Sequence, residues 1–163
     1  MKKKVVLFSS ILTMAFFLFQ ANLFSATANS TPFKFCFWPG AGIPLTEKVD
    51  GGCIGIVTYG NVDGIDLGII SLTKKVSGGK VAIITNGEKA RGIELGIANF
   101  QNHMSGFQAG IYNRSTNLRS GAQLGIVNRS NRGNGMQFGI VNIMENGFVR
   151  VFPFINFPKD WFH

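Results

Sequence analysis

The feature that most constrains this chain is an eight-residue phrase that recurs about every fourteen residues. Residues 106–142 contain it three times, as GFQAGIYN, GAQLGIVN and GMQFGIVN. Copies with more changes lie on both sides, so that units start at residues 51, 64, 78, 92, 106, 121, 135 and 147. Such even spacing indicates an array in which each unit is one structural repeat.

Within each unit the residue types alternate with a period of two, which is typical of β-strands. Counting the first glycine as position 1, positions 2, 4 and 6 are almost always apolar, as in Ile93, Leu95 and Ile97. Position 3 is Gln or a polar substitute, and glycine occupies positions 1 and 5 in most copies. We therefore expect the apolar positions to face the core and the glycines and the polar residue to lie on the opposite face.

A single unit is too small to stabilise itself, so the fold class expected is an all-β repeat array of about eight units. In a β-solenoid each unit makes one turn and equivalent residues stack about 4.8 Å apart. The alternative is an antiparallel β-meander or small β-barrel with one strand per unit. The first seven copies all carry a polar last residue at the same end, which favours the solenoid. The structural ladders expected are Asn99, Asn113, Asn128 and Asn142, with Gln108, Gln123 and Gln137.

The first 28 residues have the pattern of a secretory signal peptide. Three lysines precede an apolar stretch from Val5 to Phe19, which is shorter than the about 20 residues of a membrane-spanning helix. The small residues Ala26 and Ala28 follow it, and we expect cleavage between Ala28 and Asn29. The sequence therefore predicts export across the cytoplasmic membrane.

The remaining chain reads as one domain with two distinct ends. Residues 29–50 form an N-terminal segment in which FKFCFW, at 33–38, predicts a strand that caps the first turn. Residues 51–146 are the tandem β-repeat domain. Residues 147–163 hold a degenerate last unit and an aromatic C-terminal cap, where Pro153 and Pro158 discourage further strand pairing.

Two cysteines, Cys36 and Cys53, would enter an oxidising compartment on export. They form a candidate disulfide between the N-terminal segment and the first repeat, and two buried thiols are the alternative. With only His103 and His163 elsewhere, the cysteines lack the ligand pairs of a zinc centre, so we expect no metal.

We expect no enzymatic activity and no cofactor. Asp66 and Glu94 occupy the Gln position and read as repeat variation rather than as an acid–base pair. Neither Ser115 nor Ser130 lies in a nucleophile elbow. No catalytic, metal-binding or cofactor-binding residue is therefore assigned.

The net charge says little about a partner. After residue 28, 13 basic and 8 acidic residues remain, a net charge of +5. A basic rim in the connectors could attract anionic lipid or polysaccharide, but no aromatic residues interleave with it to stack bases, so nucleic acid is not expected. The rim consists of Arg114, Arg119, Arg129 and Arg132.

The repeats resemble those of the bacterial surface-repeat-containing proteins, exported proteins built from tandem GLQLGLVN-type units. The similarity includes FCFWPGAGIPL, the central copies and FPFINF, and covers nearly all of the chain after residue 28. It implies a surface location and supplies no catalytic or ligand residues. The fragments QAGIYN, QLGIVN and QFGIVN also resemble the Gln-x-Gly-x-x-Asn core of curli fibre subunits.

These observations favour an exported, non-enzymatic β-repeat protein with a structural, adhesive or binding role. A small outer-membrane β-barrel and a fibre-forming, curli-like subunit are the alternatives. The location stays open among the cell surface, the outer membrane and the periplasm. The partner stays open among an envelope or extracellular polymer and a second copy of the chain.

Overall fold

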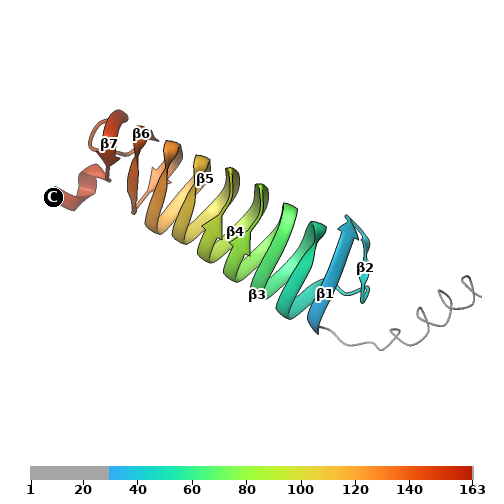
Figure 1. Ribbon diagram of the computed structural model, residues 1–163. Coiled ribbons are helices and arrows are strands. Elements are labelled where there is room, and N and C mark those ends of the chain that lie inside the picture. The colour runs from blue at the N-terminus through green and yellow to red at the C-terminus, as the bar shows by residue number, and fades with distance from the viewer. Residues whose placement is uncertain (1–29, 163) are drawn as a thin grey trace, which may run out of the picture.

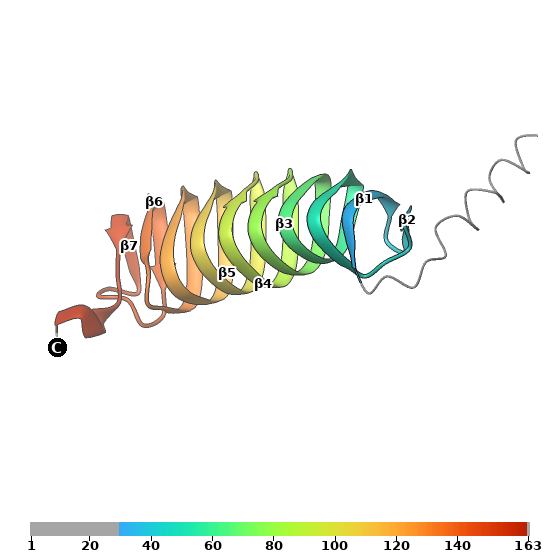
Figure 2. The same ribbon diagram turned by 90° about the horizontal axis from the view of Figure 1, so that it is seen from below.

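The computed structural model describes residues 30–162, which form a β-solenoid whose coils stack along one axis (Figures 1 and 2). The predicted signal peptide and its cleavage site at Ala28 and Asn29 lie outside the described residues. Within residues 30–162 no helix is long and apolar enough to cross a membrane. The elements are β1 (Thr31–Trp38), β2 (Ala41–Ile43), β3 (Lys48–Val81), β4 (Ile84–Leu95), β5 (Ala98–Gly133), β6 (Met136–Met144), β7 (Val151–Asn156) and the 3-10 helix η1 (Lys159–Phe162).

Neighbouring coils pair in parallel, and equivalent positions of the repeat lie beside each other. Gly92 pairs with Gly106, Gln123 with Gln137, and Asn128 with Asn142. The strand order β2-β1-β3-β4-β5-β6-β7 follows the chain apart from the first two strands. Because β3 and β5 each continue through more than one coil, they are far longer than ordinary strands. The favoured solenoid is confirmed, and the antiparallel meander or barrel is not the fold.

The predicted assignment of faces is wrong: the aliphatic positions lie outside and the amides lie inside. Ile93, Leu95 and Ile97 are exposed, whereas Gln108 and Asn113 are fully buried. Alternation shows which side chains share a face but not which face is buried. Large apolar residues usually fill a protein interior, because burying an unpaired polar group is costly. Here the buried amides are paired with one another, so that cost does not arise.

The alternation also changes phase within each unit. Position 6 points outward, position 7 is partly or fully covered and position 8 points inward, as shown by Ile97, Ala98 and Asn99. Positions 6 and 7 thus form a corner of the coil. Because of this corner, the amides at positions 3 and 8 both face the interior, although an offset of five positions would put them on opposite faces of one continuous strand.

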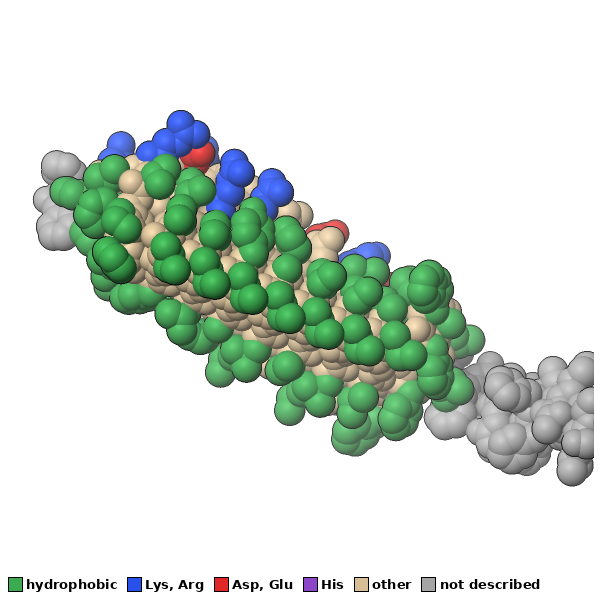
Figure 3. Space-filling view, turned by 45° about the horizontal axis from the view of Figure 1, so that its top comes forward, with side chains coloured by type: hydrophobic (Ala, Val, Ile, Leu, Met, Phe, Trp, Pro, Cys, Tyr) green, Lys and Arg blue, Asp and Glu red, His purple; other side chains and the backbone are tan. Residues whose placement is uncertain are grey.

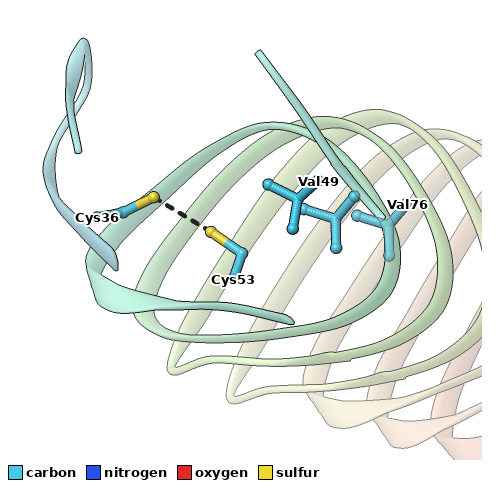
Figure 4. Close-up of a cluster of buried hydrophobic side chains, with 5 residues drawn as sticks. Cys36, Val49, Cys53 and Val76 are labelled. Carbon is cyan, nitrogen blue, oxygen red and sulfur yellow. Dashed lines mark hydrogen bonds between the residues drawn. The ribbon is translucent and has the colours of Figure 1, made fainter. Parts of the chain in front are cut away.

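The apolar part of the interior is small. One cluster contains Ala90, Met104 and Leu118. The other lies near the N-terminal end and contains Cys36, Val49, Cys53, Val62 and Val76 (Figure 4). Tyr59 packs against this second cluster. Several of these residues precede a repeat glycine by two places, where the sequence shows an additional apolar residue. They form one apolar row in an otherwise polar interior.

Short strands with an antiparallel partner lie at both ends of the array. At the N-terminal end, β1 runs parallel to the first coil and β2 pairs with β1 in the antiparallel sense. At the C-terminal end, β7 pairs antiparallel with β6. The structure therefore places residues of the 29–50 and 147–163 segments over the two ends of the repeat domain.

Candidate functional site

The four repeat asparagines form a continuous ladder inside the solenoid. Asn99, Asn113 and Asn128 each donate from Nδ2 to Oδ1 of the asparagine in the next coil, at 2.8 Å. Each also donates from Nδ2 to a main-chain carbonyl of the next coil, at 2.8–2.9 Å. The first Oδ1 accepts from the Thr85 hydroxyl, and the last Nδ2, on Asn142, donates to the Gly139 carbonyl. The ladder thus ties side chains and backbone together across successive coils.

The glycine at position 5 is required by this ladder. A Cβ at Gly110 would overlap the carbonyl oxygen of Gly96 and lie 2.6 Å from Asn99 Nδ2 and 3.1 Å from Asn113 Oδ1. The glycine at position 1 has a separate reason, because Gly106 has a φ of 121°, which side-chain-bearing residues rarely adopt. The fixed glycine-to-asparagine spacing is therefore a packing requirement.

The glutamines form a second buried ladder. Gln137 Nε2 donates to Gln123 Oε1 at 2.8 Å, and Gln123 Nε2 donates to Gln108 Oε1 at 2.7 Å. Gln108 Nε2 continues the row to Glu94 Oε2 at 2.8 Å. All three glutamines have 0 % exposure, so this row supports the coil and presents nothing to a ligand.

Charged groups extend the glutamine row toward the N-terminal end. Glu94 also accepts from Gln101 Nε2 at 2.6 Å, and its Oε1 lies 3.8 Å from Lys80 Nζ. Two coils before Glu94, Asp66 accepts from the hydroxyls of Ser71 and Thr73. Burial lowers the pKa of Lys80, while the carboxylates of Glu94 and Asp66 oppose that shift. Asp66 and Glu94 therefore accept hydrogen bonds inside the coil, at the positions that glutamine occupies in later coils.

This interior does not resemble a reaction site. Asp66, Lys80 and Glu94 have at most 1 % exposure, and hydrogen-bond donors occupy both oxygens of Glu94. Ser115 and Ser130 are buried as well, and the Ser130 hydroxyl donates to the Arg132 carbonyl. Among residues 30–162, no group of three or more His, Cys, Asp or Glu side chains could hold a metal ion.

The structure brings the two cysteines together at the N-terminal end. Cys36 Sγ and Cys53 Sγ lie 3.1 Å apart as buried free thiols, and Figure 4 shows them pointing toward each other. Burial and then the hydrogen bond with Cys36 raise the pKa of the Cys53 thiol. The structure thus contains the pair predicted from the sequence, in the unbonded state.

The outer surface carries the feature that sequence reasoning missed. Position 6 is isoleucine in seven consecutive coils, and each of these side chains is 47–63 % exposed. Positions 2 and 4 add further exposed apolar side chains, and Figure 3 shows them as rows along the solenoid. We define the aliphatic face by these two sets. The position 6 row contains Ile56, Ile69, Ile83, Ile97, Ile111, Ile126 and Ile140. The exposed members of positions 2 and 4 include Ile65, Leu67, Ile93, Leu95, Phe107 and Leu124.

The N-terminal strand β1 lengthens the aliphatic face. Phe33 and Phe35 pair with Gly52 and Ile54, which occupy positions 2 and 4 of the first unit. Both phenylalanines are more than half exposed, as is Phe37. The alternating Phe residues therefore continue the outer rows, instead of filling the interior of the coil.

No protein-family model matches this chain, and no curated protein or solved structure matches it either.

Proposed function

We propose that this chain is an exported, non-enzymatic β-solenoid that serves at the cell surface as a rigid binding or structural element. The observation that carries the proposal is the division of roles within the repeat. Its polar residues bond to one another inside the coil, while its aliphatic residues stand in regular rows outside. A surface built in this way presents apolar contacts and holds no reacting groups.

The proposed export is supported by the sequence of residues 1–28 and by the resemblance to surface-repeat-containing proteins. The basic start, the apolar stretch and the small residues before Asn29 have the order of a cleaved signal. A regular apolar surface of this extent also suits a protein that operates next to a membrane or another macromolecule.

The test is to express the full chain in a bacterial host, fractionate the cells and determine its N-terminus by mass spectrometry. We expect a product that begins at Asn29 in the envelope or medium, and that added protease removes from intact cells. The variant Ala28→Trp should block cleavage, because the site requires a small residue, whereas Asn29→Gln should leave it intact. A product that retains Met1 and fractionates with the cytoplasm would exclude the proposed function.

A further inference from the structure

The outer surface of the solenoid is divided into an aliphatic side and a polar side. Positions 2, 4 and 6 form the aliphatic face, and most residues after the position 8 side chain are polar. On the polar side, Asn102, Thr116 and Asn131 are exposed, as are Lys74 and Lys75. The chain is thus amphipathic across its width, along nearly its whole length.

The aliphatic face is larger than solubility alone would allow. Its thirteen defining side chains each expose between 37 % and 63 % of their surface. Because they stand in rows along successive coils, they make one apolar patch that follows the repeat array. Soluble monomers usually expose at most a few hundred Å² in one patch, and larger patches mark contacts with proteins or membranes. This face therefore requires an occupant.

The charges beside the face indicate which occupant it is. Arg91 directly precedes the position 1 glycine Gly92, and Arg119 lies two residues before Gly121, at one long edge of the face. Beyond the position 6 corner, Arg114 and Arg129 follow the buried asparagines at the other edge. Figure 3 shows Lys and Arg side chains along an edge of the apolar rows. Long basic side chains at such edges can reach anionic groups in the plane of the face.

From this arrangement we propose that the aliphatic face docks on a bilayer that contains anionic phospholipid. The solenoid lies flat, its isoleucine rows enter the boundary between headgroups and acyl chains, and the edge arginines contact the anionic headgroups. The inference deepens the proposed function, on which it rests, because the bilayer concerned is an envelope membrane.

A second copy of the chain is a less favourable occupant. Two copies packed through this face would bring arginine-flanked edges against each other, and like charges across an interface are costly. Within residues 30–162, Asp50 and Asp63 are the acidic groups at the Arg91 edge, and both lie near the N-terminal end, at least two coils from Arg91. An anionic bilayer provides negative charge opposite Arg91, Arg119, Arg114 and Arg129 alike.

The experiment is flotation of the processed chain with phosphatidylcholine vesicles, with and without phosphatidylglycerol. Export is measured separately, so the two proposals can fail independently. A cytoplasmic chain that binds vesicles would contradict only the proposed function. An exported chain that does not bind vesicles would contradict only this inference. We expect flotation with phosphatidylglycerol vesicles, weaker flotation with phosphatidylcholine alone, and loss of the difference at high salt.

Two matched pairs of variants assign the binding to the face and its edges. The triple variant Ile97→Thr, Ile111→Thr and Ile126→Thr should bind roughly 100-fold more weakly. Its control, Asn102→Thr, Thr116→Asn and Asn131→Thr on the polar side, should bind normally. The double variant Arg114→Gln and Arg129→Gln should bind anionic vesicles about tenfold more weakly, with no change for vesicles of phosphatidylcholine alone. Its control, Lys74→Gln and Lys75→Gln, should lose clearly less.

Circular dichroism shows whether each variant keeps the fold. If the triple variant unfolds, the single variant Ile126→Thr carries the test, with an expected loss of about fivefold against none for Asn131→Thr. Equal binding by face and control variants would overturn the inference, as would an absence of binding by the unaltered chain. A stable dimer in light scattering that dissociates in the face variant would identify a second copy as the occupant and likewise overturn it.

Discussion

The coils from residue 92 to 142 and those from 51 to 85 have the same backbone but different interiors. In the later coils, positions 3 and 8 hold Gln and Asn, apart from Glu94 at the start. In the earlier coils position 3 is Cys53, Asp66 and Lys80, and position 8 is Thr58, Ser71 and Thr85. The pairing nevertheless keeps the same offset where the two regions meet, as at Gly78 and Gly92.

The difference shows that the backbone geometry does not depend on one kind of interior residue. An amide side chain has both a donor and an acceptor, so an amide in one coil can hydrogen-bond to an amide in either neighbouring coil. A charged rung needs a specific neighbour, as Glu94 needs donors from Gln101 and Gln108 beside Lys80. The later coils are therefore interchangeable, whereas the earlier coils work only in their present order.

The largest effect that would test this comparison comes from the interior glycines. We expect Gly110→Ala to lower the free energy of unfolding by about 3–5 kcal/mol, because the new Cβ overlaps a backbone carbonyl and two ladder amides. Gly79→Ala, in the earlier region, should change it little, since a Cβ there meets nothing within 4 Å. Chemical denaturation measures both, and similar losses would show that the glycines serve only backbone freedom.

The buried charges should show strong dependence on their neighbours. Lys80→Gln alone should lower the free energy of unfolding by about 3 kcal/mol, because it leaves Glu94 and Asp66 buried without their cation. The double variant Lys80→Gln and Glu94→Gln should recover most of that loss, since it extends the amide row. A double-mutant cycle measures the coupling, and additive losses would contradict it.

The lowered pKa of Lys80 adds a dependence on pH. Between the lowered pKa and the usual 10.5, the unfolded chain binds more protons than the folded chain. The stability of the unaltered chain should therefore rise with pH across that window relative to the double variant. Parallel pH profiles for the two proteins would mean that Lys80 titrates normally.

A break in the asparagine ladder should lower the free energy of unfolding slightly less than Lys80→Gln does. Leu has nearly the same size as Asn, but Asn113→Leu removes the acceptor of Asn99 Nδ2 and the donor to Asn128 Oδ1 and to the Leu124 carbonyl. We expect a loss of about 2–3 kcal/mol in denaturation experiments. The exposed control Asn131→Leu should change stability by less than about 1 kcal/mol. An equal effect at both positions would exclude an interior ladder.

The ladder can also be extended into the earlier region. Thr85→Asn should lower the free energy of unfolding by about 2 kcal/mol. Ala82 occupies position 5 of this coil, and its methyl group would crowd the new amide. The double variant Thr85→Asn and Ala82→Gly should recover this loss and add a rung below Asn99. Thermal denaturation of both variants decides the question, and a harmless single variant would contradict the glycine–asparagine requirement.

The smallest effect should come from the outer face. Ile126→Thr should change the free energy of unfolding by less than about 1 kcal/mol, since this side chain is already half exposed and Thr favours strands. The measurement is again denaturation, with Arg129→Ala as a comparison at the neighbouring edge. A loss as large as that of Asn113→Leu would show that the isoleucine row is buried after all.

The sequence predicted the array, its period and its parallel stacking, because identical letters at fixed spacing require equivalent positions. It also predicted which amides form ladders. It did not predict that those ladders lie inside, because large apolar residues usually fill a protein core. Gln123 and Asn128 are both fixed letters, but their offset of five positions would make them face opposite ways on one continuous strand. That spacing was the available signal of a corner between them.

Other parts of the site lie beyond pattern reasoning. The contacts of Asp66, Lys80 and Glu94 depend on which neighbour each side chain meets in the next coil, and spacing alone does not specify that. The proximity of Cys36 and Cys53 depends on the register in which β1 pairs with the first coil. Once the interior is known to be polar, however, the exposed isoleucine row follows directly from the sequence.

The central claim, that paired amides form the interior, can be tested most directly by hydrogen exchange of the side-chain amides, followed by NMR. We expect the Nδ2 protons of Asn113 and Asn128 to be strongly protected, because both are fully buried and bonded to the next coil. The exposed Asn131 should exchange at the rate of a free side chain. Equal, rapid exchange at all three positions would contradict the account.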